Sequence, residues 1–275
     1  TYVILEKQKG KCEMSIYDSL NDMQKKAVLQ TEGPVLILAG AGSGKTRVLT
    51  HRIAYLIDEC RVMPWNIMAI TFTNKAANEM LERAKETVGP AVGDIWSGTF
   101  HHVCNRILRI YAPYLGYRCN FLIADRDDSR RMIEKAMKQV GVSGDSFPKR
   151  EVLSSLFGNA ANRAIPLREV LEEKMAETPF NFDTIEQVYD VYTSMKFDDG
   201  IMDFDDLLVN TYRLFRDMPE VLDRYVDRFR YVLVDEFQDT NYVQGCIVWQ
   251  LTEARRAICV VGDDAQSIYL SLIHI

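Results

Sequence analysis

The sequence has no apolar run long enough to cross a membrane. Its 275 residues contain no stretch of about 18 consecutive apolar residues, the length that a spanning helix requires. Near the N-terminus, Lys7, Lys9 and Lys11 are followed by polar residues and not by the apolar segment of a secretory signal. We therefore expect a cytoplasmic protein that has no membrane partner.

Paired cysteines are also missing. The sequence has six cysteines, none in a CxxC pair or at metal-ligand spacing. This pattern predicts reduced, mostly buried thiols, with neither a disulfide nor a zinc site. The six are Cys12, Cys60, Cys104, Cys119, Cys246 and Cys259.

No excess of basic charge is present, since 33 Lys and Arg face 39 Asp and Glu for a net charge of −6. This balance argues against a uniformly basic nucleic-acid-binding protein, but a groove lined locally would still suffice. A hydrophobic content of 47% is ordinary for a globular protein. The length predicts two compact units, or one domain with a large insertion.

The segment 35–46, VLILAGAGSGKT, has the features of a phosphate-binding loop. Its first four residues predict a strand buried on both faces. The glycines that follow allow the backbone to curl so that its N–H groups point inward to a polyphosphate. The cradle would consist of Ala39, Gly40, Ala41, Gly42, Ser43 and Gly44.

Lys45 would reach the β- and γ-phosphates, and Thr46 would give its hydroxyl to Mg²⁺. Residues 47–56 would form a helix whose N-terminus faces the anion. Ala39 stands where the strict pattern has glycine, but alanine is nearly as small. The alternative is a glycine-rich turn that joins a strand to a helix.

The surrounding chain predicts an α/β fold with a parallel sheet flanked by helices. Residues 1–18 show no periodicity and are expected to be irregular, and Asn21 is expected to cap a short helix that reaches Val28. Further strands are predicted at 68–72, 231–234 and 257–261, and a helix is predicted at 74–88. Residues 96–108 are predicted to run from a strand into a helix. From about 111 to 197 helical patterns broken by Gly and Pro indicate a mostly helical insertion.

A second site follows the strand predicted at 231–234, which ends in Asp235 and Glu236. Asp235 would bind Mg²⁺ mostly through water, and Glu236 would act as the general base for an attacking water. The alternative is that Asp235 and Glu236 are only solvated acidic residues at the end of a strand. After the strand predicted at 257–261, Gln266 could sense the γ-phosphate, unless this segment is only an Asp- and Gly-rich turn.

Seven stretches occur in one order: LNDMQKKAV, AGAGSGKT, TFTNKAANEM, GTFHHVCNRIL, DFDDLL, VDEFQDTN and GDDAQSIY. Together they resemble the N-terminal half of UvrD/PcrA/Rep-type superfamily 1 DNA helicases. The resemblance implies a RecA-like P-loop NTPase domain of the 1A type with an inserted 1B-type helical domain. It divides the chain into 1A (1–111), 1B (112–198), the rest of 1A (199–269) and a tail outside the family pattern (270–275).

The resemblance also assigns residues to an ATP site that uses Mg²⁺. Gln24 resembles the glutamine that reads the adenine edge, and Arg47 the residue that packs on the adenine ring. Gln238 and Gln266 resemble glutamines that link the γ-phosphate to movement of the DNA-binding elements. Catalysis would involve Lys45, Glu236 and Gln266.

Single-stranded DNA is the implied partner. Aromatic rings stack on any base at about 1 to 3 kcal/mol each, so such contacts need no sequence recognition. Phe72 and Phe100 could instead be core aromatics, and Asp205 and Asp206 are expected to cap or order a helix. The implied DNA contacts are Phe72, Thr73, Asn74, Thr99, Phe100, His101 and Tyr269.

The implied activity is ATP-dependent 3′ to 5′ movement along single strands and at single/double-strand junctions, by a protein we expect to be monomeric. The family pattern stops at LSLIHI, so we expect a second RecA-like domain and its arginine finger to be missing. Our hypothesis is that these last residues are foreign to the reading frame. Such a chain would bind nucleotide but hydrolyse it poorly. A binding module without turnover is the alternative, and a P-loop kinase is a weaker one.

Overall fold

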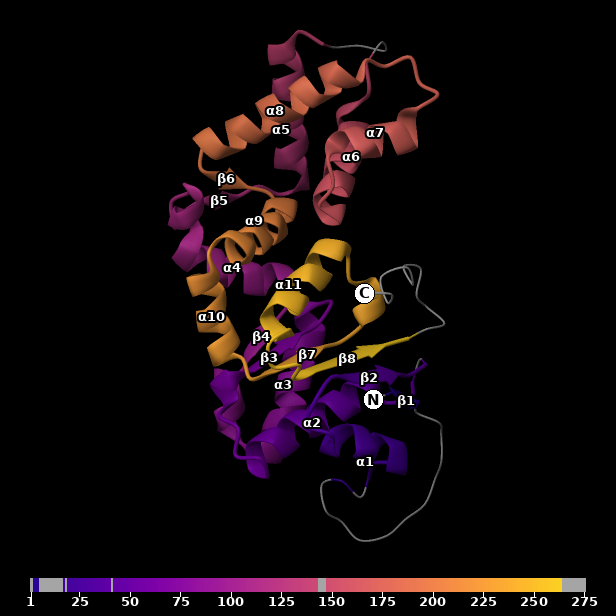
Figure 1. Cartoon of the computed structure of the whole chain (residues 1–275), viewed down its shortest axis with the longest axis vertical. Helices are drawn as coiled ribbons and strands as arrows, with labels where there is room; N and C mark the ends of the chain where they lie inside the picture. The colour runs from indigo at the N-terminus through magenta and orange to yellow at the C-terminus, as the bar shows by residue number, and fades with distance from the viewer. Residues whose placement is uncertain (1, 5–16, 18, 41, 143–146, 264–275) are drawn as a thin grey trace. The chain divides into compact units, whose positions relative to one another are not determined.

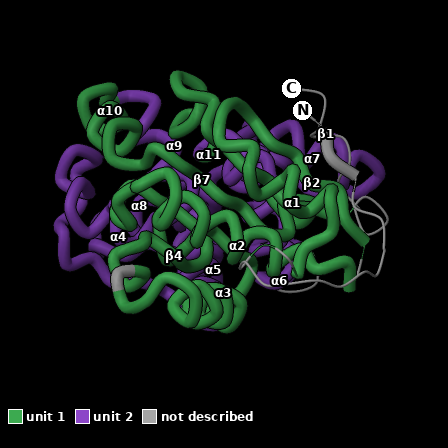
Figure 2. Tube along the Cα trace, turned by 90° about the horizontal axis from the view of Figure 1, so that it is seen from below, with its two compact units in different colours: residues 1–103, 218–240, 248–275 green, residues 104–217, 241–247 purple. Residues whose placement is uncertain are grey.

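The structure is a computed structural model that describes residues 2–4, 17, 19–40, 42–142 and 147–263. The chain divides into two compact units, which Figure 2 draws in different colours. Unit 1 comprises 1–103, 218–240 and 248–275, and unit 2 comprises 104–217 and 241–247. The insertion predicted at 112–198 falls inside unit 2, and its limits stay a prediction.

Unit 1 contains a six-stranded sheet in which every pair of neighbouring strands is parallel. Its order is β1-β2-β8-β7-β3-β4, and the predicted α/β fold is confirmed (Figure 1). The strands are β1 (Tyr2–Ile4), β2 (Val35–Leu38), β3 (Ile67–Ile70), β4 (Trp96–Gly98), β7 (Tyr231–Val234) and β8 (Ile258–Gly262).

Two predictions about the first strands are wrong. Tyr2–Ile4 forms a strand that pairs with β2, although residues 1–18 were expected to be irregular. A three-residue strand is too short to leave a periodic pattern in the sequence. In β2, Val35 and Ile37 are buried but Leu36 and Leu38 are partly exposed, so this strand is not fully buried on both faces.

Three helices of unit 1 share one hydrophobic core on a face of the sheet (Figure 1). They contribute residues such as Val28, Ile53 and Met80, which are all buried. Asn21 caps the first of them through a reciprocal capping box with Gln24, so the predicted helix start is confirmed. The helices are α1 (Asp22–Leu29), α2 (Lys45–Asp58) and α3 (Asn74–Val88), and unit 1 also contains α10 (Pro219–Arg228). Its short 3-10 turns are η1 (Pro64–Asn66), η2 (Pro90–Asp94) and η4 (Phe237–Asp239).

Unit 2 is mostly helical and has a separate hydrophobic core, to which Leu153, Val170 and Ile185 belong. Its elements are η3 (Ala112–Leu115), α5 (Arg126–Val140), α6 (Arg150–Arg163), α7 (Leu167–Met175), α8 (Phe182–Asp198), α9 (Phe204–Asp217) and a parallel pair, β5 (Leu122–Ile123) and β6 (Ile201–Met202). Two helices, α4 (Phe100–Tyr111) and α11 (Tyr242–Thr252), contain residues of both units.

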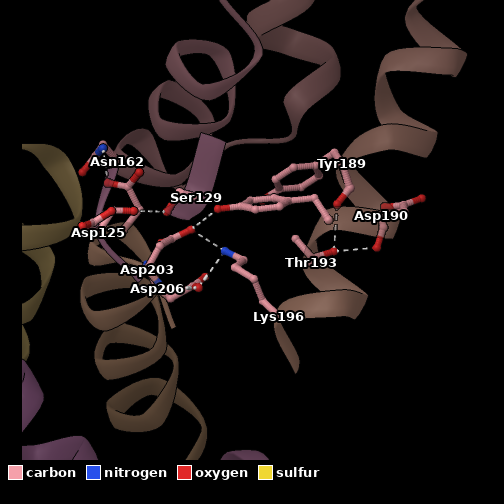
Figure 3. A network of polar contacts seen from close by, with 11 residues as sticks. Asp125, Ser129, Asn162, Tyr189, Asp190, Thr193, Lys196, Asp203 and Asp206 are labelled. Carbon is pink, nitrogen blue, oxygen red and sulfur yellow. Dashed lines mark hydrogen bonds and ion pairs between the residues drawn. The ribbon is translucent and has the colours of Figure 1, made fainter. Parts of the chain in front are cut away.

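A buried ionic cluster joins α8 to the start of α9 within unit 2 (Figure 3). Lys196 Nζ donates to Asp203 Oδ2 at 2.5 Å and to Asp206 Oδ2 at 2.6 Å, and Tyr192 donates to Asp203 at 2.7 Å. Asp203 and Asp206 each accept a hydrogen bond from the backbone N–H of the other, a reciprocal cap of α9. The expected capping role is confirmed for Asp206, whereas the Asp205 carboxylate accepts a hydrogen bond from Asn162.

The pKa values of the two carboxyl groups in this cluster are shifted in opposite directions. Burial and the neighbouring charge of Asp203 raise the pKa of Asp206 to about 6. Burial also disfavours the charge of Asp203, but the ammonium of Lys196 outweighs it and lowers the pKa of Asp203. The Lys196 ammonium favours ionisation of both carboxyl groups, but it outweighs burial only at Asp203.

The five described cysteines are unpaired thiols. Cys104 and Cys259 are buried, Cys246 is half-buried, and Cys60 and Cys119 are exposed, so the expectation that most are buried is wrong. Among the residues that the structure describes, no helix combines the length and apolar character needed to cross a bilayer.

Candidate functional site

The glycines of the phosphate loop are required by the backbone. Gly42 has φ 73° and Gly44 has φ 90°, in the left-handed region that side chains other than glycine rarely adopt. The loop leaves β2 with the Ala39 N–H donating to the Gly262 carbonyl at 3.0 Å. It therefore begins beside the end of β8 and turns directly into α2.

The N-terminus of α2 is available to an anion. Gly44 is its N-cap and supplies no side-chain cap, so the first N–H groups of the helix have no intrahelical or capping acceptor. Ser43 Oγ is buried and has no hydrogen-bond partner among the described residues. Both observations fit a phosphate group, which accepts hydrogen bonds from such donors.

The acidic pair lies at the end of β7. Asp235 donates its backbone N–H to the Ile70 carbonyl of β3 at 2.9 Å, which continues the strand ladder by one residue. Glu236 has φ 50° and ψ 47°, an uncommon left-handed conformation for a residue with a side chain. The chain thus turns sharply, and the two carboxylates leave the strand in different directions.

These elements bring the lysine and the glutamate together. Lys45 Nζ lies 2.9 Å from Glu236 Oε2 and 3.9 Å from Asp263 Oδ2. Gln238 Nε2 donates to Glu236 Oε2 at 2.6 Å, and Gln238 Oε1 accepts from the Asp263 N–H at 3.1 Å. One polar network therefore joins the loop after β2 to the ends of β7 and β8.

The two carboxylates differ in their electrostatic surroundings. Burial, followed by the charge of Glu236, raises the pKa of Asp235 to about 6. For Glu236 burial acts in the same direction, but hydrogen bonds from Gln238 and Lys45 outweigh it and lower the pKa. Glu236 is therefore ionised at neutral pH, and a nearby cation would favour ionisation of Asp235.

The donor atoms here suit a magnesium ion. The Thr46 hydroxyl hydrogen bonds to the Asp235 carboxylate, so the two predicted ligands touch. Mg²⁺ takes oxygen ligands and usually keeps several waters, with one or two carboxylates and substrate phosphates. Among the described residues, no group of three or more His, Cys, Asp or Glu is placed to hold a metal by itself.

Gln24 lies beside the loop. Its Nε2 donates to the Ser43 carbonyl at 3.0 Å, and its Oε1 accepts from the Asn21 N–H at 3.0 Å. A glutamine amide has two donor hydrogens and two acceptor lone pairs, so one of each is left. That remaining pair matches the donor and acceptor on the adenine edge.

Comparison with known proteins gives the family. The model of the UvrD/REP helicase N-terminal domain matches residues 20–270. The chain belongs to the UvrD/REP helicase N-terminal domain family. It is 45% identical over 254 residues to the ATP-dependent DNA helicase PcrA of Bacillus subtilis (strain 168), and 43% identical over 255 residues to the proteins of that name from Staphylococcus aureus (strain Mu50) and Staphylococcus epidermidis. These matches cover 92% to 93% of this chain but 34% of each relative, so the chain spans about a third of their length.

The DNA contacts implied by the helicase family follow β3 and β4, which pair side by side at Ile70 and Gly98. Phe72 lies two residues after the end of β3 and is 65% exposed, as a stacking platform requires. Thr73 caps α3, and Thr99 Oγ1 accepts from the His102 N–H. Phe100 is only 8% exposed and His101 is half-buried, so their predicted DNA contacts find less support than that of Phe72.

Some predicted residues of this helicase domain lie outside the described residues: Ala41, Gln266, Tyr269 and the tail at 270–275. Arg47 is exposed on the first turn of α2. Asp263 is a site residue that was not predicted. It belongs to the network around Lys45 and is 2% exposed. The available signal was its position two residues after the strand predicted at 257–261.

Proposed function

We propose that this chain is the nucleotide-binding part of an ATP-dependent DNA helicase of the cytoplasm. The observation that carries the proposal is the 2.9 Å contact between Lys45 and Glu236. It brings the lysine of a phosphate loop to a carboxylate that is 191 residues away in the sequence. Phosphate binding and water activation need these two groups in one place.

Lys45 would exchange carboxylate partners for phosphate oxygens when nucleotide binds. In this structure its ammonium lies 2.9 Å from Glu236 Oε2 and 3.9 Å from Asp263 Oδ2. A β- or γ-phosphate offers the same negative charge on oxygens that the α2 N-terminus also favours. Release of Lys45 would free Glu236 to accept a proton from an attacking water, while Gln238 keeps that carboxylate oriented.

Base recognition would come from α1 and the first turn of α2. The remaining donor and acceptor of the Gln24 amide would read the adenine edge, and the exposed Arg47 would pack on the ring. Thr46 and Asp235 would hold Mg²⁺, which supplies charge neutralisation to the phosphates when it is bound. These roles predict a preference for ATP over GTP.

Single-stranded DNA would lie across the ends of β3 and β4. Phe72 supplies an exposed ring, and the polar side chains of Thr73, Asn74 and Thr99 would contact the backbone of the strand. Movement in the 3′ to 5′ direction, action at single/double-strand junctions, the monomeric state and a second RecA-like domain rest on the family resemblance. Gln238 and Gln266 would link the nucleotide state to this movement.

Nucleotide binding to a Lys45→Ala variant tests the proposal. Loss of a charge-assisted contact should weaken Mg-ATP binding by at least about tenfold, measured by isothermal calorimetry. The matched control is Lys75→Ala on α3, since Lys75 is 87% exposed and pairs only at 3.9 Å with Glu79. Equal affinities for the two variants would contradict the assignment of the phosphate site.

A further inference from the structure

Arg52 on α2 has an unusual environment for a charged residue. It is 2% exposed and is among the largest fully buried side chains in the described part of the chain. No ion pair joins it to a carboxylate within that part, and its Nε has no hydrogen-bond partner there. A guanidinium that is buried without a counter-ion carries a desolvation cost, so its retention needs a reason.

The partners of Arg52 are carbonyl groups at the end of α1. Nη1 donates to the Ala27 carbonyl at 2.7 Å and lies 3.5 Å from the Val28 carbonyl. Both residues belong to the last turn of α1, whose carbonyl groups have no partner within the helix. The positive charge also lies at the negative end of the helix dipole, so Arg52 acts as a C-terminal clamp.

The same helix is held at a second point. Gln24 donates to the Ser43 carbonyl in the phosphate loop, and α2 follows this loop directly. Gln24 lies in the first half of α1 and the Ala27 and Val28 carbonyl groups lie in its last turn, so α1 is attached at two separate points along its length. Together with the packing of Ala27 and Val28 in the core, these two polar attachments fix the orientation of α1 relative to the loop and α2.

We propose that Arg52 is a positioning residue that sets the Gln24 amide against the adenine base. This inference rests on the proposed role of Gln24 in reading adenine. The clamp holds α1 to the helix that carries Lys45 and Thr46, so the base reader and the phosphate site share one support. Loss of the clamp should therefore affect recognition of the base more than recognition of the phosphates.

The test measures the binding of Mg-ATP, Mg-GTP and inorganic triphosphate to four proteins: the wild-type chain, Gln24→Ala, Arg52→Met and the double variant. In the wild type we expect ATP to bind at least about fivefold more tightly than GTP. Arg52→Met should reduce this ratio as Gln24→Ala does, and the double variant should match Gln24→Ala. Affinity of Arg52→Met for inorganic triphosphate should stay within about twofold of wild type, because Arg52 contacts the carbonyl groups of α1 and not the phosphate loop.

A control variant shows the effect of a purely structural defect in α2. Ile53→Val, on the next residue of α2 and also fully buried, should lower stability without changing the ATP/GTP ratio. A ratio that is normal in Arg52→Met but lost in Gln24→Ala would overturn the positioning role and leave the proposed function intact. A ratio that Gln24→Ala does not change would instead contradict adenine reading itself.

If Arg52→Met does not fold, Arg52→Lys decides the question. The ammonium of lysine keeps the charge but not the planar fork, so it is not equivalent to a guanidinium. The inference predicts a partial loss of the ATP/GTP ratio in the wild-type background and none in the Gln24→Ala background. A ratio equal to that of the wild type would overturn it.

Discussion

Phe72 is a large aromatic side chain that is 65% exposed at the end of β3. Replacing it with alanine should weaken binding of a single-stranded oligonucleotide by about 1 to 3 kcal/mol, because one stacking platform is lost. Fluorescence anisotropy with a labelled thymidine oligonucleotide measures this change. The control is Trp65→Ala, since Trp65 is 46% exposed but precedes β3 and so lies at its other end. A similar loss in both variants would contradict a specific role for Phe72.

The Asp206 carboxyl group should give the chain a characteristic pH dependence. Its pKa is about 6 in the folded chain and about 3.9 in an unfolded one, so between these values the folded chain binds more protons. The contribution of Asp206 to the free energy of unfolding therefore falls as the pH rises from about 4 to about 6. Asp206→Asn cannot titrate, and its free energy of unfolding should rise relative to wild type through that window.

Urea unfolding at several pH values measures this difference. Asp217→Asn provides a control of opposite sign, because the hydrogen bond from Arg216 lowers the pKa of Asp217. The stabilising contribution of Asp217 is present above its unfolded pKa and is lost as the pH falls. A difference between Asp206→Asn and wild type that does not change with pH would contradict the raised pKa of Asp206.

Single residues could be predicted where their chemistry is local. Lys45, Thr46, Asp235 and Glu236 follow predicted strands in recognisable patterns, and the structure brings them together. Asp263 was missed although it follows a predicted strand, because that position does not reveal its contact with Lys45, which lies far away in the sequence. Long-range partners are set by the order of the strands in the sheet, which the sequence does not state.

At the scale of elements, the ionic cluster between α8 and α9 should contribute strongly to the stability of unit 2. Lys196→Met would leave the buried carboxylates of Asp203 and Asp206 without their cation, at a cost of about 3 to 5 kcal/mol. Urea unfolding followed by circular dichroism measures this loss. Lys138→Met is the matched control, because Lys138 is 70% exposed and its solvent-exposed pair with Glu134 should contribute little to stability. Comparable losses would contradict the buried contribution.

The helices and strands predicted individually lie close to their predicted positions, because each carries a periodic or continuous apolar pattern, whereas the helices after residue 111 were predicted only as a mostly helical segment or not at all. Asn74–Val88 begins and ends at the predicted residues, and Asn21 caps α1 as expected. The failures have a physical cause as well. Tyr2–Ile4 becomes a strand only because the edge of β2 offers it a hydrogen-bonding partner, and such tertiary pairing leaves no trace in three residues.

At the scale of the whole molecule, the residues proposed to bind nucleotide and DNA follow the C-terminal ends of strands in the parallel sheet of unit 1. The nucleotide residues follow β2, β8 and β7, and the proposed DNA residues follow β3 and β4. The Asp235 N–H bonds to the Ile70 carbonyl, and Phe72 is two residues further along the chain. The acidic pair and the proposed DNA residues therefore follow paired strands, and the coupling between them is what the last measurement tests.

The most direct test of this account is the affinity of the chain for Mg-ATP, measured alone and with a saturating single-stranded oligonucleotide. Displacement of a fluorescent ATP analogue gives both values. We expect specific nucleotide binding, and we expect the affinity for Mg-ATP to change by at least about fivefold when the oligonucleotide is present, because binding at coupled sites is reciprocal. A folded chain that binds no nucleotide, or binds it with the same affinity in both conditions, would contradict the proposal that the nucleotide and DNA sites of this chain are coupled.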